Sequence, residues 1–238
     1  MKPLNQLSAE DFLEGQLLLV DKPLGYTSFQ AVNALKWAII RKFKLKKLKI
    51  GHAGTLDPLA SGLLIICTGK STKQIANYQG LEKTYTGTFT LGATTPSYDL
   101  ETEIDAQFET AHITPEAIEL TRKQFLGPIM QHPPLFSAIK KEGKRLYEIA
   151  REGKTTTTTA RAIEIYTFDI DSSEFESKQT LDFTVSCSKG TYIRSLAHDF
   201  GKAVGSGAHL SQLRRTAIGP YQVSGAQTPE EIKTLLCT

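Results

Sequence analysis

The segment Lys49–Gly69 (KIGHAGTLDPLASGLLIICTG) constrains this chain most, because it sets a turn-rich loop between two apolar, strand-like runs. Asp57 lies in this loop, and His52 lies five residues before it. Loops held by a rigid scaffold often carry function, so we expect Asp57 to be displayed rather than packed. An aspartate before a proline can also be an ordinary turn residue that bonds the local backbone, and this alternative stays open. The residues that allow tight turns here are Gly51, Gly54, Pro58 and Gly62.

The length and the apolar content fit a globular protein. The chain has 238 residues, 40% of them hydrophobic, enough for one large domain or two small ones. The net charge of +3 says little about partners. The run Arg41–Lys49 (RKFKLKKLK), however, holds six positive residues and no acid. Such a run suits a phosphate backbone, although it is also typical of a solvated face.

Cysteines, histidines and hydropathy exclude several classes of protein. The three cysteines form no CxxC motif and the five histidines are scattered, so we expect no disulfide framework and no metal. No glycine-rich loop for a nucleotide cofactor is evident, and we expect the protein to need no cofactor. The sequence has no apolar run of about 18 residues, and MKPLNQLSAEDFLEG lacks the apolar core of a signal peptide. We therefore expect a cytoplasmic protein without a membrane span.

Apolar runs, alternation and cap residues predict an α+β fold. Strands are expected at residues 17–20, 63–67, 83–91, 161–170 and 180–187. Helices are expected from Thr27 or Ser28 to Phe43, from Thr114-Pro115-Glu116 to about Phe125, after Thr191 as cap over Ile193–Phe200, and after Thr228. Trp37 is expected on the surface of the first of these helices or against a neighbour.

The string GHAGTLDPLASGLL at residues 51–64 closely resembles the active-site segment of the TruB-type family of tRNA pseudouridine synthases. Further blocks resemble the family in the same order: DKPLGYTSFQAV at 21–32, EKTY at 82–85, PPLFSAIKKEGKRLYEIAREG at 133–153, SKGTYIRSLAHDFG at 188–201 and GAHLSQLRR at 207–215.

This resemblance implies a pseudouridine synthase-like catalytic domain. Its central mixed, mainly antiparallel sheet would be flanked by helices, with an RNA-contacting insertion at about 125–155. Many relatives continue into a C-terminal PUA domain, whereas only Thr216–Thr238 follow Arg215 here, so we expect a single domain over 1–238. The implied reaction isomerises the TΨC-loop uridine, tRNA position 55, through base flipping, glycosidic cleavage and reattachment through C5. The implied partner is the T-arm of tRNA, without cofactor or metal, and we expect a monomer.

The resemblance also assigns three catalytic positions. Asp57 matches the nucleophile, Arg194 the arginine that pairs with it, and Tyr85 the tyrosine that stacks on the target base and is a candidate general base. From the residues alone, Arg194 could equally be an exposed helix arginine, and the alternation around Tyr85 indicates a core residue. Whether the carboxylate attacks C1′, attacks C6 or removes a proton from C2′ is left open.

Further positions match RNA-contacting residues of the family. His52 would lie in the T-loop contact region, and Tyr192 and Leu213 would pack beside the uracil. Lys22 and Lys73 fall on family lysine positions. Each could contact the base, or could instead stabilise the structure or bind phosphate. The block at 133–153 has the basic and aromatic mixture of an RNA-contacting loop. Its candidate contacts are Lys140, Lys144 and Arg145.

Two other functions are weighed against this one. A glycoside hydrolase would need a second carboxylate beside Asp57, and the sequence offers no convincing one. An RNA-binding tRNA folding factor, with incidental catalysis, stays open as the alternative. The sequence also departs from many relatives at Pro96, where they carry an aspartate, while Asp99 is retained. A polar network that depends on that aspartate is therefore in doubt.

Overall fold

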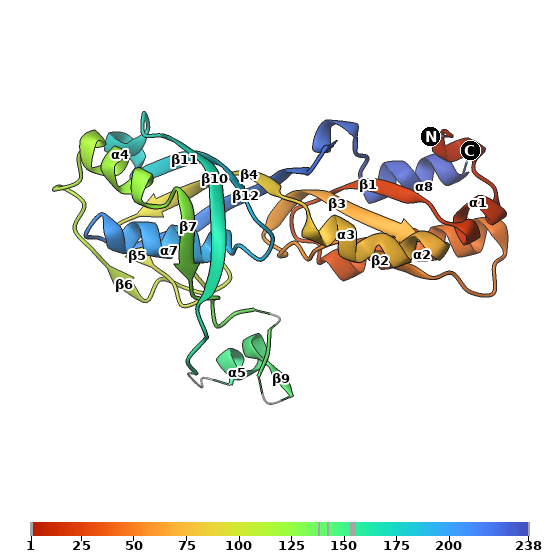
Figure 1. Cartoon of the computed structure of the whole chain (residues 1–238), viewed down its shortest axis with the longest axis horizontal. Helices are drawn as coiled ribbons and strands as arrows, with labels where there is room; N and C mark the ends of the chain where they lie inside the picture. Colours follow the sequence, from red (N-terminus) through yellow and green to blue (C-terminus); the bar gives the residue numbers. More distant parts are fainter. Residues whose placement is uncertain (1, 138, 142, 153–155, 238) are drawn as a thin grey trace. The chain divides into compact units, whose positions relative to one another are not determined.

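The chain forms two compact units, which we describe separately. This computed structural model describes residues 2–137, 139–141, 143–152 and 156–237 (Figure 1). The first unit comprises Met1–Tyr85 and Arg214–Thr238, and the second comprises Thr86–Leu213. Strands β4 (Lys83–Leu91) and β12 (Ala208–Ile218) have residues in both units.

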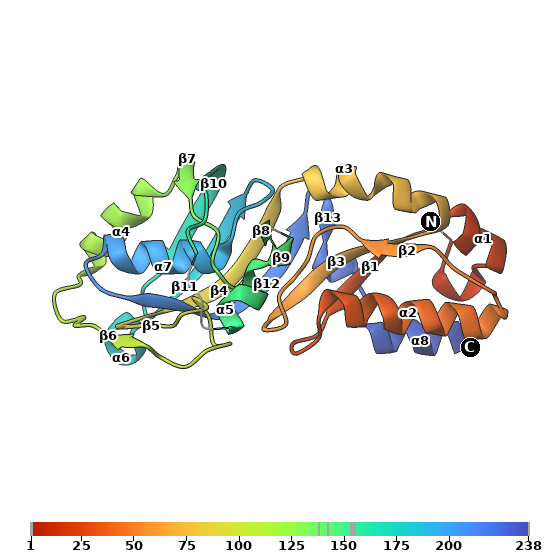
Figure 2. The same ribbon diagram turned by 90° about the horizontal axis from the view of Figure 1, so that it is seen from below.

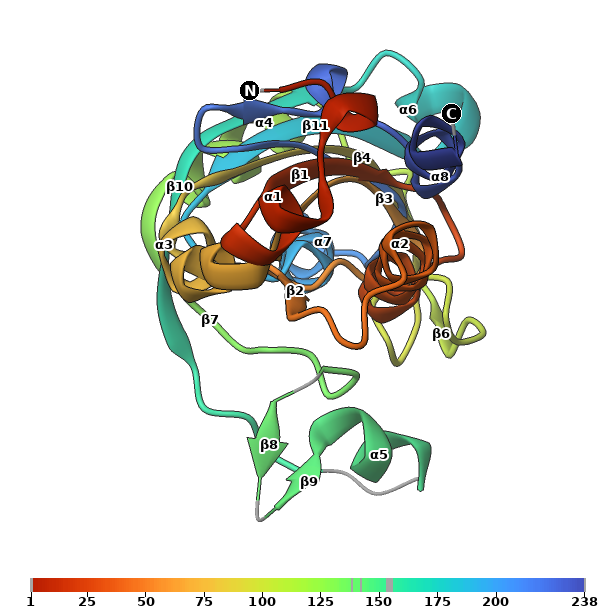
Figure 3. The same ribbon diagram turned by 90° about the vertical axis from the view of Figure 1, so that its right-hand side faces the viewer.

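The first unit is a small sheet with helices packed on it. Its strands run in the order β1–β3–β12, with β2 paired to β3 and β13 to β12. These strands are β1 (Leu17–Lys22), β2 (Ile50–His52), β3 (Ala60–Thr68) and β13 (Tyr221–Gln222). The helices are η1 (Leu4–Gln6), α1 (Ala9–Glu14), α2 (Ser28–Phe43), η2 (Gly69–Gln74), α3 (Ile75–Gly80), η3 (Val223–Gly225) and α8 (Pro229–Cys237). Helices α2 and α8 lie side by side (Figures 2 and 3).

Strand β3 is the centre of this unit because it is buried on both faces. Leu64 and Ile66 pack into the cluster under α1, α2 and α8, whereas Leu63 and Ile65 pack into a second cluster on the opposite face. At Gly62, a Cβ would lie 2.2 Å from the carbonyl oxygen of Arg215, and φ is +106°. Only glycine allows β12 to approach β3 so closely at this point.

The second unit contains a twisted antiparallel sheet with helices and a small basic insertion, which is formed by β8, β9 and α5. Its strands run in the order β12–β4–β11–β10–β7. Its other strands are β5 (Ala93–Thr94), β6 (Ala106–Gln107), β7 (Gly127–Gln131), β8 (Lys140–Lys141), β9 (Lys144–Arg145), β10 (Arg161–Asp171) and β11 (Thr180–Cys187). Its helices are α4 (Pro115–Gln124), α5 (Leu146–Arg151), α6 (Phe175–Lys178) and α7 (Ile193–Ala203).

A phenylalanine cluster forms the core of this second unit. The ring centroid of Phe89 lies 4.3 Å from that of Phe183, 6.2 Å from that of Phe168 and 5.8 Å from that of Phe200. These four side chains come from β4, β11, β10 and α7, so the cluster joins the sheet to the helix that carries Arg194.

The α+β class and most predicted elements are confirmed. Thr27 caps α2 and Thr114 caps α4, as expected, and β10 and β11 pair antiparallel. The prediction that Thr191 caps α7 is wrong. The N-cap is Tyr192, and the Thr191 hydroxyl instead donates to the carbonyl of Ser188 at 2.9 Å, which stabilises the preceding turn.

Candidate active site

Asp57 lies in the loop between β2 and β3, and its two chain neighbours are each fixed by another segment of the first unit. The Ser28 hydroxyl donates to the carbonyl of Leu56 at 3.0 Å and accepts from the Leu56 amide at 2.8 Å. The Gly25 amide donates to the carbonyl of Pro58 at 2.8 Å. The Asp57 side chain itself is half-buried. The carboxylate is therefore presented by a backbone that is fixed on both sides.

Arg215, on β12, supports the same loop from inside the protein. Its side chain is fully buried, and its guanidinium donates to three carbonyl oxygens: Leu63 at 2.8 Å, Gly54 at 3.2 Å and Thr55 at 3.4 Å. The planar guanidinium suits this role because its N–H groups diverge in a fixed geometry. One side chain thus joins the start of the Asp57 loop to the strand that follows it.

Lys22, the last residue of β1, places a second buried cation in this region. Its ammonium donates to the carbonyl of Tyr26 at 2.6 Å and to that of Pro23 at 3.0 Å. Burial lowers the pKa of Lys22 to about 8; the Asp57 carboxylate opposes this shift and the Arg215 guanidinium adds to it. Lys22 has no exposed surface. The geometry therefore favours a structural role, in which Lys22 holds the local backbone, over contact with phosphate.

Three other predicted site residues lie in the first unit: His52, Tyr85 and Lys73. His52 ends β2 and is half-buried, and its Nδ1 has no hydrogen-bond partner among the described residues. Burial lowers the pKa of His52, and the nearby charge of Arg215 adds to this. Tyr85 is buried on β4, as the alternation predicts, whereas Lys73 is exposed in the last turn of η2.

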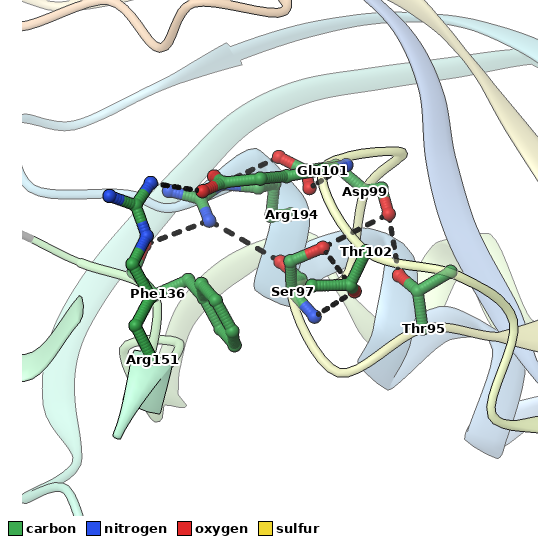
Figure 4. Close-up of polar contacts among 8 residues, drawn as sticks. All are labelled: Thr95, Ser97, Asp99, Glu101, Thr102, Phe136, Arg151 and Arg194. Atoms are coloured by element: carbon green, nitrogen blue, oxygen red, sulfur yellow. Dashed lines mark hydrogen bonds and ion pairs between the residues drawn. The ribbon is translucent and has the colours of Figure 1, made fainter. Parts of the chain in front are cut away.

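In the second unit, Arg194 is buried at the start of α7 and forms an ion pair with Asp99 (Figure 4). Its Nε lies 3.5 Å from the Asp99 carboxylate, and its Nη1 donates to the carbonyls of Phe136 at 2.9 Å and Ser97 at 3.3 Å. The alternative of an exposed helix arginine is therefore wrong. The predicted pairing of Arg194 with Asp57 stays a prediction, because the two residues belong to different units.

The loop that carries Asp99 has its own polar network despite Pro96. The hydroxyls of Thr95 and Ser97 both donate to the Asp99 carbonyl, at 2.6 and 3.1 Å, and Ser97 Oγ lies 2.8 Å from Thr102 Oγ1 (Figure 4). This network gives the loop a fixed shape without an aspartate at position 96. It also holds Asp99 facing the guanidinium of Arg194.

Tyr192 and Leu213 also belong to the second unit. Tyr192 is half-buried, and its backbone is held by the side-chain amide of buried Gln131, which accepts from the Tyr192 amide at 2.8 Å and donates to its carbonyl at 3.0 Å. Leu213 is half-buried on β12. The backbone of Tyr192 is thus fixed two residues before Arg194.

The predicted RNA-contacting block forms a small insertion of the second unit, made of β8, β9 and α5 (Figures 1 and 3). Lys144 and Arg145 are exposed on β9, whereas the side chain of Lys140 lies outside the described part of the chain. Arg145 and Arg151 both lie over the ring of Tyr147, at 5.8 and 5.4 Å from its centroid. Exposed cations around one aromatic ring are typical of RNA-binding surfaces.

Two residues that support the site were missed from the sequence. Ser28 looks like a helix cap and Arg215 like a surface arginine, whereas both are buried and bond the backbone of the Asp57 loop. No local signal distinguishes them, because their partners lie 28 and about 160 residues away in the chain. In the described part of the chain, no group of histidine, cysteine and acidic residues could hold a metal ion, and no helix could span a membrane.

Comparison with known proteins gives one consistent family. Residues 41–193 match the TruB family pseudouridylate synthase (N terminal domain), and residues 194–238 match the tRNA pseudouridylate synthase B C-terminal domain. A relative from Flavobacterium johnsoniae named "tRNA pseudouridine synthase B" is 61% identical over 92% of this chain and 95% of its own. One of the same name from Parabacteroides distasonis is 49% identical over 95% of both chains.

Solved structures agree on the fold. A chain from the crystal structure of a Cbf5-Nop10-Gar1 complex superposes with a TM-score of 0.65, at 29% identity, over 92% of this chain and 54% of that one. A chain from an H/ACA RNP bound to a substrate RNA containing 2′-deoxyuridine gives 0.60, at 27% identity, over 89% and 49%. The chain thus spans about half the length of these solved chains. The family matches cover residues 41–238 and include the Asp57 loop, Arg194 and Arg215, so this chain belongs to the TruB family of pseudouridylate synthases.

Proposed function

We propose that this chain converts a uridine of tRNA to pseudouridine, with Asp57 as the catalytic residue. The observation that carries the proposal is the Asp57 loop, whose backbone is held by Ser28, Gly25 and Arg215 in a member of a pseudouridylate synthase family. A reaction that must hold a detached base needs its carboxylate at a fixed position, because small displacements of a catalytic group slow the chemistry strongly.

The substrate is the T-arm of tRNA, and the target is the TΨC-loop uridine at position 55. A loop nucleotide can be flipped out at a cost of a few kcal/mol, and stacking on an aromatic ring such as that of Tyr85 or Tyr192 offsets part of this. The bond between uracil N1 and C1′ then breaks and a bond from C5 to C1′ forms. The hydrogen of C5 leaves as a proton and N1 gains a proton, so the product is an isomer of the substrate. The reaction is redox-neutral and needs no group donor, so the enzyme works without a cofactor.

Each remaining residue has a role in this proposal. Asp57 acts as the nucleophile, Arg194 stabilises its charge when substrate is bound, and Tyr85 stacks on the base. RNA contacts come from His52, Tyr192, Leu213, Lys73, Lys140, Lys144 and Arg145. The enzyme acts as a cytoplasmic monomer, which sedimentation of the pure protein at micromolar concentration tests.

The deciding experiment uses unmodified tRNA transcript labelled with tritium at C5 of uridine, without metal or cofactor. We expect the wild type to release one tritium per tRNA, from the T-loop, and Asp57→Asn to release none while binding tRNA as the wild type does. Release of free uracil would indicate hydrolysis instead. Binding without release by the wild type would support the tRNA folding factor, and release by Asp57→Asn would exclude Asp57 as nucleophile.

A further inference from the structure

A strongly basic surface lies at the C-terminal end of α2, and the proposed reaction does not use it. The segment Arg41–Lys49, here called the basic segment, contains six cations, and all six are exposed. Its apolar residues point the other way: Leu48 is 4% exposed in the core under α2, and Phe43 and Leu45 pack against that core. The segment is therefore an ordered part of the fold that presents only positive charge outward.

Neighbouring acids do not neutralise this surface. The segment contains no aspartate or glutamate. Of the three acids on the nearby helix α1, two pair elsewhere: Asp11 with Lys2 at 3.1 Å and Glu14 with Lys70 at 2.8 Å. The third, Glu10, forms no ion pair with the segment among the described residues. Within the part of the chain that the structure describes, none of the six cations forms an ion pair. An uncompensated cluster of this kind attracts a polyanion and releases its counterions on binding.

An exposed aromatic residue adjoins the cluster. Trp37 is 61% exposed on α2 and lies four residues before Arg41, so the two side chains are neighbours on the same face of the helix. Aromatic side chains beside arginine and lysine stack on nucleic-acid bases or sugars. The combination favours RNA over other polyanions.

The position of this surface suits a substrate that extends away from the catalytic loop. The N-terminal residue of α2, Ser28, bonds Leu56 beside Asp57, and the basic segment begins in the last turn of the same helix (Figure 2). A helix of 16 residues is about 24 Å long. An RNA with its target loop at Asp57 must reach this far to touch both places, and a helical stem that continues from that loop can do so.

We propose that Trp37 and the basic segment form a second RNA-contact surface, which binds the phosphate backbone of a helical stem of the substrate while the target uridine occupies the Asp57 site. The inference rests on the proposed function, since it takes the substrate to be a folded RNA. The inference adds a length requirement for the substrate. RNA that extends about 24 Å from the target loop reaches the basic segment and binds more tightly, whereas shorter RNA does not reach it.

The test compares two variants that remove equal charge. Lys46→Gln/Lys47→Gln alters the basic segment, and Lys123→Gln/Lys178→Gln alters two exposed lysines of the second unit. Each is titrated with full-length unmodified tRNA and with a short hairpin that carries only the target loop and a few base pairs. We expect the first variant to bind tRNA roughly tenfold more weakly, with a salt slope lower by about two, and to bind the hairpin normally. The control variant should match the wild type with both RNAs.

Trp37 supplies an independent readout, because it is the single tryptophan of the chain. Its emission should change on titration with tRNA and stay constant with the hairpin. Equal tRNA affinity and salt slope in the two variants, or unchanged Trp37 emission with bound tRNA, would overturn the proposed surface. Tritium release by the wild type is measured in parallel. If it fails while the binding difference persists, the proposed reaction is wrong and the RNA surface stands.

Discussion

Ser28 and Leu56 exchange two hydrogen bonds through one hydroxyl, which donates to the Leu56 carbonyl at 3.0 Å and accepts from its amide at 2.8 Å. Both residues are buried, so no water replaces these bonds when the hydroxyl is removed. The residue after Leu56 is Asp57. A helix terminus therefore sets the position of the Asp57 loop directly.

Ser28→Ala should lower the free energy of unfolding by about 2 kcal/mol, because two buried backbone groups lose their partner. It should also slow tritium release under single-turnover conditions more than it weakens tRNA binding. Ser8→Ala, which removes the exposed cap of α1, is the control and should lower stability by about 1 kcal/mol without changing the rate. Equal rates for the two variants would mean that the Ser28 bond does not position Asp57.

Arg215→Lys should reduce the single-turnover rate by about 10- to 100-fold, because an ammonium keeps the charge but cannot reach three divergent carbonyls. Arg215→Met removes the charge as well and should lower stability further. Comparing the two variants separates positioning from electrostatics. A wild-type rate in Arg215→Lys would show that charge alone matters at this position.

Lys22 predicts a specific dependence of stability on pH. Its pKa is about 8 in the folded protein, whereas an ordinary exposed lysine has a pKa of 10.5, so between these pH values the unfolded chain binds more protons. Raising the pH through this window should therefore stabilise the wild type, by up to about 3 kcal/mol at 1.36 kcal/mol per pKa unit. Below pH 8 this gain is absent.

Lys22→Met isolates that contribution, because the other titrating groups are common to both proteins. Urea unfolding at pH 7, 8, 9 and 10 should show the free energy of unfolding of the wild type rising relative to that of the variant. Parallel pH profiles would mean that Lys22 is not perturbed as described.

The ion pair between Asp99 and Arg194 should contribute much more to stability than the ion pair between Glu101 and Arg151. Asp99 and Arg194 are both buried, whereas Glu101 pairs with exposed Arg151 at 2.7 Å. Asp99→Asn should lower stability by about 3 kcal/mol or more, because it leaves a buried guanidinium without its counter-charge. Glu101→Gln should change stability by less than about 1 kcal/mol. Thermal or urea unfolding of both variants checks this, and similar losses would contradict it.

Local sequence predicts the strands and helices whose faces differ in polarity. The alternation over Lys83–Leu91 corresponds to β4, and Thr27 and Thr114 cap the helices that follow them. Strand β12 was not predicted, because its sequence AHLSQLRRTAI mixes polar and apolar residues without a period of two. Its buried polar side chains are satisfied by partners far along the chain, which no local pattern reveals.

The same limit applies to the site. The loop, Asp57 and the opening of the helix with Arg194 follow from motifs, since turn residues and family blocks are local signals. The ion pair of Arg194 with Asp99 links residues 95 positions apart, and its burial depends on the packing of α7 against the sheet. Such contacts are properties of the tertiary structure.

The place of Arg215 in β12 has a consequence for biosynthesis. Chains are made from the N-terminus, and the Asp57 loop leaves the ribosome long before the strand that supports it. A nascent chain that ends before β12 contains every residue of the loop motif but lacks the guanidinium that bonds Gly54, Thr55 and Leu63. The enzyme therefore becomes competent only after β12 has been synthesised, so chains released from the ribosome before that point should not modify RNA.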